Sequence, residues 1–127
     1  KMGQLRKNMR KVNFSGANLF KATLNDVDLT EANLFEADLN RIDLSGANLC
    51  KAILSKANLF EANLSRANLR EADLTGVNLR RANLNKAVLD GVKLENAFIE
   101  ETTLPIQYKE YIRSLKVNGF DEVNWIK

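Results

Sequence analysis

The sequence predicts an all-β solenoid, in which the chain winds as a coil with short, straight sides. The main observation is a large apolar residue at every fifth position, from Phe14 through Leu19 and Leu24 to Leu104, without an insertion. We call each of these nineteen residues a centre. The residue two before the centre is Ala in thirteen repeats, and the residue one before it is Asn or Asp in thirteen. A pattern repeated this often indicates a repeat architecture.

A period of five fits neither a regular helix nor a flat strand. On an α-helix five residues advance about 500°, so successive centres would be rotated by about 140° and would never share one face. On a flat strand side chains alternate, so every second centre would point to the opposite side. A chain that turns a corner once per repeat keeps every centre, and the small residue two before it, on the inside.

The other two features that recur in the repeat have simple physical roles. A narrow coil leaves little room beside four large centres, so the second inward residue must be small. Asn or Asp before the centre is expected to accept hydrogen bonds from the backbone at the corner. Glycine occupies the second position after the centre in four repeats, where others carry Lys, Glu or Arg, so glycine is allowed there and not required: Gly16, Gly46, Gly76 and Gly91.

Runs such as Ala57-Asn58-Leu59-Phe60-Glu61 resemble the A(D/N)LXX signature of the pentapeptide repeat proteins. The resemblance covers residues 12–106, about three quarters of the chain. It implies a right-handed quadrilateral β-helix with four pentapeptides per coil, and many members of the family occur in cyanobacteria. Nineteen repeats would make about 4.75 coils and a rod a little over ~20 Å long.

The two ends of the chain depart from the repeat. Residues 1–11 carry five basic residues and no acid, and are expected to form a basic arm or a cap on the first coil. In residues 107–127, the spacing of Tyr108, Tyr111, Ile112 and Leu115 after Pro105 predicts an amphipathic helix that Gly119 ends. Phe120, Val123, Trp125 and Ile126 are expected to fold back after it. This segment is predicted to cap the last coil, and dimerisation through it is a second role that is compatible with the first.

Positions twenty apart should stack in columns on the outside of the coil. Several columns alternate in charge, such as Glu31, Lys51 and Glu71, which favours a solvated, ion-paired surface. Phe20 and Phe60 share a column with Asn40 between them, and Phe35 lies on a neighbouring face, so these three phenylalanines are the candidate protein-contact residues. Two apolar residues at outward positions, Val88 and Phe98, are expected to be covered by the C-terminal tail.

No residue is predicted to act in catalysis, cofactor binding or metal binding. The chain has no histidine and a single cysteine, Cys50, so it can form neither an internal disulfide nor a Cys–His pair. Cys50 lies at an outward position and is expected to be an unreactive thiol. No apolar run exceeds three residues, against the roughly 20 needed for a membrane-spanning helix.

The favoured function is therefore a non-enzymatic structural or protein-interaction scaffold, with another protein as partner and with neither nucleic acid nor membrane. The resemblance also implies an alternative, a DNA-mimicking binder of a type II topoisomerase that protects it from quinolones. That mechanism needs a strongly acidic rod, whereas residues 12–106 hold ten basic and thirteen acidic residues, a net charge of −3. The cytoplasm is the favoured location, and a lumenal or periplasmic one would require the removal of a signal segment.

Overall fold

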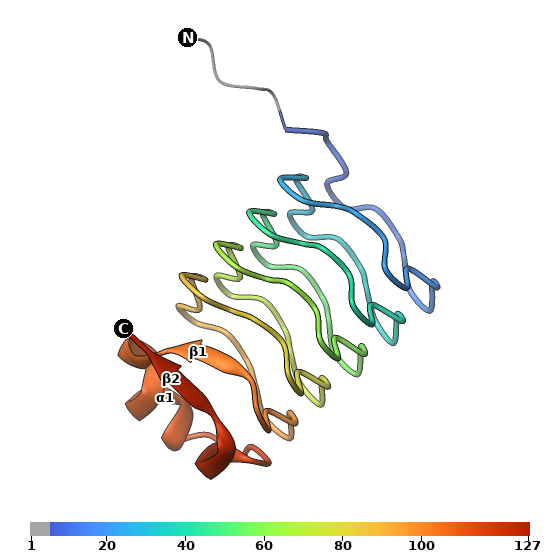
Figure 1. Cartoon of the computed structure of the whole chain (residues 1–127). Helices are drawn as coiled ribbons and strands as arrows, with labels where there is room; N and C mark the ends of the chain where they lie inside the picture. The colour runs from blue at the N-terminus through green and yellow to red at the C-terminus, as the bar shows by residue number, and fades with distance from the viewer. Residues whose placement is uncertain (1–5) are drawn as a thin grey trace, which may run out of the picture.

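The computed structural model describes residues 6–127, which form a single stacked coil with a short helical segment at its C-terminal end (Figure 1). Residues twenty apart pair in parallel along the whole stack, as in Asn13 with Asn33 and Asn33 with Ile53. Because five residues make one side, twenty residues make a coil with four sides. Each side pairs with the next coil through one residue, so the sides form isolated bridges between stacked coils and not extended strands.

The coil begins at Asn8, which pairs with Asp28, four residues before the expected start at residue 12. Met9 N–H donates to the Asp28 carbonyl at 2.8 Å, so Met9 takes the place of a centre. The segment expected to be an arm or a cap therefore contributes at least residues 8–11 to the first coil. Of the other basic-arm residues, 1–5 lie outside the described residues.

Every corner uses the same turn. The N–H of the residue three after a centre donates to the carbonyl of that centre, as Ala17 does to Phe14 at 2.9 Å. The second residue after the centre has positive φ in every repeat from Phe14 to Ile99, for example 59° at Lys21 and 68° at Gly16. This left-handed conformation explains why glycine recurs there. Charged residues also adopt it, because their N–H groups donate to the next coil, as Lys21 does to the Asn40 carbonyl at 3.0 Å.

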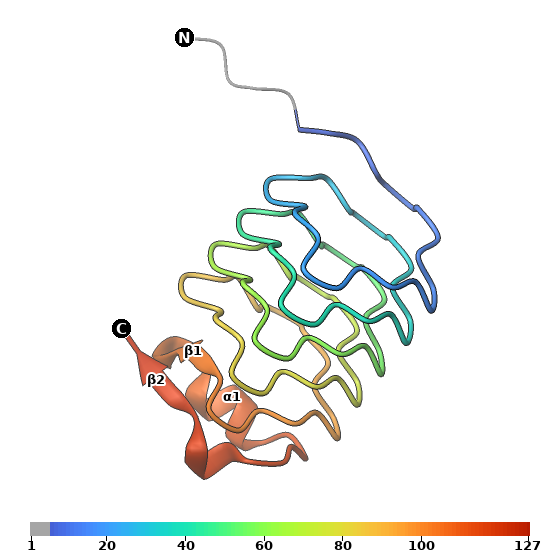
Figure 2. The ribbon, with the colours of Figure 1, turned by 45° about the vertical axis from the view of Figure 1, so that its right-hand side comes forward.

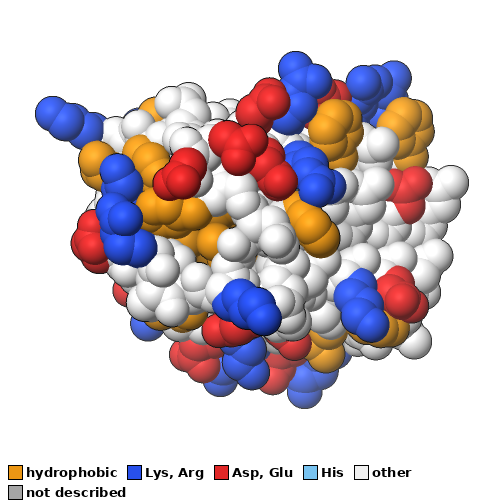
Figure 3. All heavy atoms as spheres, turned by 90° about the horizontal axis from the view of Figure 1, so that it is seen from below, with side chains coloured by type: hydrophobic (Ala, Val, Ile, Leu, Met, Phe, Trp, Pro, Cys, Tyr) orange, Lys and Arg blue, Asp and Glu red, His pale blue; other side chains and the backbone are white. Residues whose placement is uncertain are grey.

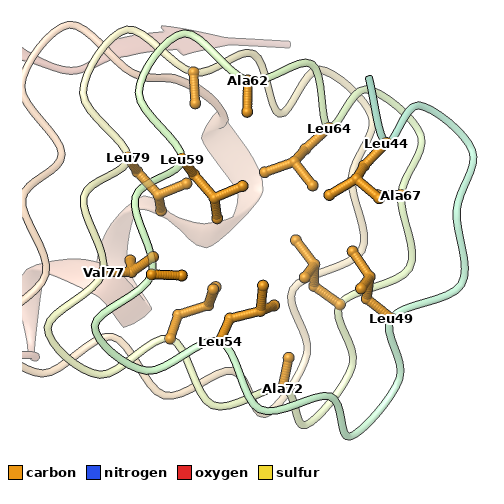
Figure 4. Packing of buried hydrophobic residues seen from close by; sticks show 14 of the residues in the cluster. Leu44, Leu49, Leu54, Leu59, Ala62, Leu64, Ala67, Ala72, Val77 and Leu79 are labelled. Carbon is orange, nitrogen blue, oxygen red and sulfur yellow. The ribbon is translucent and has the colours of Figure 1, made fainter. Parts of the chain in front are cut away.

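The interior is filled as the repeat predicts. Leucines from all four sides point to the middle of the coil, and alanines occupy the remaining space (Figure 4). The centres from Leu29 to Leu104 are at most 1% exposed. Burial of one leucine stabilises the fold by roughly 1.5–3 kcal/mol before the entropy of ordering is subtracted.

The C-terminal segment follows strand β1 (Thr103–Pro105) as the 3-10 helix η1 (Ile106–Tyr108) and the helix α1 (Lys109–Arg113). Helix α1 lies across the end of the last coil (Figure 2), and Ile112 is fully buried in the core. The helix was expected to continue to Gly119, but it ends at Arg113. The reason is that the following residues return to the coil, where Asn118 pairs with Phe98.

The returning chain adds part of one more coil. The 3-10 helix η2 (Phe120–Glu122) leads into strand β2 (Asn124–Ile126), which pairs in parallel with β1. Gly119, at the start of η2, has a φ of 90°, and a Cβ atom there would collide with the Glu100 side chain and lie 2.9 Å from the Glu100 nitrogen. Glycine is therefore required at this position.

Candidate interaction surface

Phe20 and Phe60 stack in the same column, as expected, with Asn40 between them. The column is fixed by backbone bonds between successive coils, from Lys21 N–H to the Asn40 carbonyl and from Arg41 N–H to the Phe60 carbonyl. Phe20 is 47% exposed, and the Lys21 ammonium lies 5.3 Å from the centre of its ring. Phe60 is half-buried. The two rings therefore form one candidate contact column, in which Phe20 is the more accessible.

Phe35 lies on the neighbouring side of the coil and does not join that column. It follows Asn33, which pairs with Ile53 on the next coil, so Phe35 and Ile53 share a side. Ile53 is 41% exposed and Phe35 is half-buried. Ile53 was not among the candidate contact residues, although an isoleucine in place of the usual Asn or Asp at an outward position is itself a signal of an apolar surface residue.

The outward charges form ladders, as the columns predict. Arg41 Nε lies 2.7 Å from Glu61 Oε1, Arg81 Nη1 lies 3.2 Å from Glu61 Oε2, and Arg81 Nε lies 3.4 Å from Glu101 Oε1. Figure 3 shows basic and acidic side chains interspersed on the face seen from below, with hydrophobic side chains gathered towards the end that holds α1. Such exposed pairs each contribute roughly 0–1 kcal/mol, so their main effect is on register and surface charge.

The Asn and Asp side chains before the centres are occupied by the backbone, as expected. Asn33 Oδ1 accepts the Phe35 N–H at 3.0 Å, and Asn58 Oδ1 accepts the Phe60 N–H at 3.0 Å. These bonds recur in fourteen repeats, at each Asn or Asp in this position from Asn8 to Asn83. They tie these side-chain oxygens to the corners. The residue after each centre, which in three repeats is a candidate phenylalanine, faces outward.

Three further outward positions, those of Val88, Phe98 and Cys50, are each only partly exposed. Neither Val88 nor Phe98 is fully exposed. Phe98 pairs with Asn118 of the C-terminal segment and is stacked under the Arg80 guanidinium, at 4.4 Å from the ring centre. Cys50 is a half-buried free thiol.

Two ionisable groups are shifted by their surroundings. The Thr30 hydroxyl donates to Asp28 and lowers the pKa of this carboxyl; the Thr30 N–H and the Arg10 guanidinium also lower it, while partial burial opposes them. Burial raises the pKa of the Tyr108 phenol, and its hydrogen bond to Asp90 Oδ1 at 2.6 Å raises it further. Both groups make structural contacts between neighbouring segments.

Residues 6–127 contain no group of three or more His, Cys, Asp or Glu side chains placed to hold a metal ion. Within the same part of the chain, no helix combines the length and the apolar character needed to cross a bilayer.

Comparison with known proteins agrees with the repeat geometry. The model of the pentapeptide repeats matches residues 8–34, 28–66 and 62–100, with eight copies. No curated protein matches the chain. A pentapeptide repeat protein of the Arabidopsis thaliana thylakoid lumen is 26% identical, with a TM-score of 0.71 over 88% of this chain and 79% of that one.

Two cyanobacterial proteins are also similar. HetL of Nostoc, a pentapeptide repeat protein involved in the regulation of heterocyst differentiation, is 37% identical, with a TM-score of 0.56 over 80% of this chain. The chain spans 45% of HetL. Another pentapeptide repeat protein of Nostoc is 30% identical over 97% of this chain and all of that one, with a TM-score of 0.39. The structural neighbours imply a right-handed quadrilateral β-helix. Because its repeats match the family model over residues 8–100, the chain belongs to the pentapeptide repeat family.

Proposed function

We propose that the chain is a non-enzymatic scaffold that binds another protein through outward side chains of its flat sides. The observation that carries this proposal is the exposure of Phe20 and Ile53, neither of which belongs to the core or packs against it. Burial of aromatic side chains is a main source of affinity at protein interfaces. Phe20, Phe35 and Phe60 are the proposed contact residues, and Ile53 joins Phe35 on its side of the coil.

The C-terminal segment is proposed to close the core and thereby to keep the rod a discrete unit. The burial of Ile112 and the packing of Tyr108, Leu115 and Trp125 against the core support this role. Two exposed apolar residues of the segment, Ile106 and Tyr111, are available for dimerisation through the same end. A cap and a dimer contact are compatible, because Ile112 is buried while Ile106 and Tyr111 stay partly exposed.

Affinity capture from cells of the native host tests the scaffold. The baits are the wild-type chain, the double variant Phe20→Ser with Phe60→Ser, and the control Lys51→Ser, which changes an exposed residue on a different side. We expect a protein that the wild-type and Lys51→Ser baits retain and that the double variant loses. Equal recovery on all three baits would remove the phenylalanine column from the proposal.

Mimicry of DNA is the less well supported alternative. The outward charges alternate along the column from Arg41 to Glu101, so the rod lacks the continuous negative charge of a phosphate backbone. A supercoiling assay with DNA gyrase and a quinolone distinguishes the two functions. We expect no protection at stoichiometric amounts of the chain, and clear protection would favour mimicry.

A further inference from the structure

Within residues 6–127, the N-terminal end of the coil leaves its core partly open. We call residues 6–25 the first coil and residues 26–45 the second. The first-coil centres Phe14, Leu19 and Leu24 are only half-buried, whereas the equivalent second-coil centres, such as Leu34, are at most 1% exposed. Helix α1 covers the opposite end, and no part of residues 6–127 crosses this one (Figure 2). The Arg6 side chain turns away along the stack, where it donates to the Gly46 carbonyl at 2.6 Å.

Within residues 6–127, the same end also presents a backbone edge without partners. In the second coil, Asn33 N–H donates to the Val12 carbonyl at 2.9 Å, and its own carbonyl accepts the Phe14 N–H at 2.7 Å. Among residues 6–127, none makes the matching backbone bonds with Asn13, Asn18 or Thr23. An edge of this kind pairs readily with an extended peptide, and the exposed centres beside it supply apolar contact area.

The charge of the first coil indicates which kind of segment would bind at this edge. The first coil contains five basic residues and no acid, whereas the second contains six acids and one basic residue. The two coils pair across their contact, with Arg10 Nη1 at 3.7 Å from Asp28 Oδ2 and Lys11 Nζ at 4.0 Å from Glu31 Oε1. On its covered side, therefore, the first coil stacks against an acidic coil. Arg6, Arg10 and Lys11 all contact later coils, so the basic rim of the open end consists of Lys7 and Lys21.

Lys21 supports the same conclusion. Its column alternates in charge from Arg41 through Glu61 and Arg81 to Glu101, so alternation would place an acid at position 21. The lysine there stacks on Arg41, a like charge, which disfavours the fold slightly. The open end therefore carries a lysine where the ladder would place an acid.

We propose that the open end of the first coil binds an extended, acidic segment of another protein. The segment pairs its backbone with the edge at Asn13, Asn18 or Thr23, places apolar side chains on Phe14 and Leu19, and brings its carboxylates to the basic rim. This inference rests on the proposed scaffold function and names the class of partner.

Two other occupants fit less well. A second copy of the chain, joined through the same N-terminal end, would bring together two coils that each carry five basic residues and no acid. The second is the segment before the coil: continuing the repeat backward places Gln4 at a centre and Lys7 at the small position, and neither residue type matches the apolar core.

A binding assay with a matched pair of variants tests the proposal. The probe is a fluorescein-labelled peptide of residues 26–45, which has the repeat spacing and a net charge of −5. The variants are Lys21→Glu, at the open end, and Lys86→Glu, its control. Both lysines follow a centre by two residues and stack on an arginine of an adjacent coil, Arg41 and Arg66 respectively. Both changes therefore replace a like-charge contact by an opposite one.

Fluorescence anisotropy should show that the peptide binds the wild-type chain and Lys86→Glu with affinities within twofold of each other. Lys21→Glu should bind at least tenfold more weakly while its thermal midpoint is equal to or above that of the wild type. Opposite effects on binding and stability separate a role in binding from a structural role. Raised salt, or a peptide with its carboxylates replaced by amides, should weaken binding in the same direction.

The proposal is overturned if the peptide does not bind, or if Lys86→Glu weakens binding as much as Lys21→Glu. It is also overturned if sedimentation shows a wild-type dimer that Lys21→Glu dissociates, because the second copy is then the occupant. A cellular partner that requires Phe60 but not Lys21 would leave the scaffold function intact and remove this inference alone.

Discussion

The residue before each centre determines how well a repeat closes its corner. Where it is Asn or Asp, the side-chain oxygen accepts the N–H two residues later, as Asp73 Oδ1 accepts the Thr75 N–H at 3.0 Å. Ile53 cannot accept this bond, and its side chain is instead exposed to solvent. The repeat therefore tolerates an apolar residue at this position without the corner bond.

Ile53→Asn should stabilise the chain. The new amide oxygen can accept the Ser55 N–H, and a hydrogen bond of this kind contributes roughly 0.5–1.5 kcal/mol. Urea unfolding measures the change in the free energy of unfolding. Ile53→Ala is the control, because it removes the isoleucine without adding an acceptor, and it should not reproduce the gain. If both variants gain equally, the hydrogen bond is not the cause.

Asp28 should make stability depend on pH. Its pKa is lower in the folded than in the unfolded chain, because Thr30 and Arg10 favour the carboxylate. Its contribution is therefore present above the unfolded pKa, about 4, and is lost as the pH falls through the folded value. Asp28→Asn keeps the oxygen that accepts the Thr30 N–H but not the charge. Urea midpoints at pH 7 and pH 3 should differ less for this variant than for the wild type, and an equal difference would contradict the assignment.

The C-terminal elements owe their structure to packing against the coil. Helix α1 has five residues, too few to be stable alone in water, so its contact with the core must hold it in place. Ile112 provides that contact, and Tyr111 adds a hydrogen bond from its hydroxyl to the Val92 carbonyl at 2.6 Å. The Phe120 and Trp125 rings, 5.4 Å apart, join η2 to β2.

Ile112→Ala should cost about 2–5 kcal/mol of unfolding free energy, the range for truncation of a fully buried isoleucine. Ile106→Ala is the matched control, because the same truncation is made in η1 at a side chain that is 45% exposed. It should change stability by roughly 0.5 kcal/mol or less. Chemical denaturation of the two variants measures both effects, and similar losses would show that α1 does not cover the core.

The five-residue period predicts the coil, because no regular helix or strand gives every centre the same surroundings. The two parts of the coil that were not predicted lie where the sequence does not show this period. The first repeat was missed because Lys7 and Met9 stand where a small residue and a leucine are usual. The last partial coil was missed for a related reason. Asn118 pairs twenty residues after Phe98, but Gly119 at the next centre has no side chain to mark it.

The candidate surface was predictable only in part. Columns of residues twenty apart placed Phe20 and Phe60 together and Phe35 apart from them. Sequence treats Phe20 and Phe60 as equivalent, yet Phe20 is the more exposed because it lies in the first coil, which has a described neighbour on one side only. The sequence predicted a cap on the last coil and either an arm or a cap at the first, and the pattern alone did not decide between the two at the first coil.

The asymmetry between the two ends should set the order in which the stack opens. Four centres on one side make the same backbone bond to the next coil, at 2.7–2.8 Å, and differ only in position along the stack: Leu19, Leu39, Leu59 and Leu79. Opening the first coil breaks one interface between coils, whereas opening an inner coil breaks two. Hydrogen exchange measured by NMR should therefore be fastest at the Leu19 amide and slowest at Leu59 and Leu79. Equal exchange at all four amides would mean that the rod opens only as one unit, and that the uncovered first coil costs it no local stability.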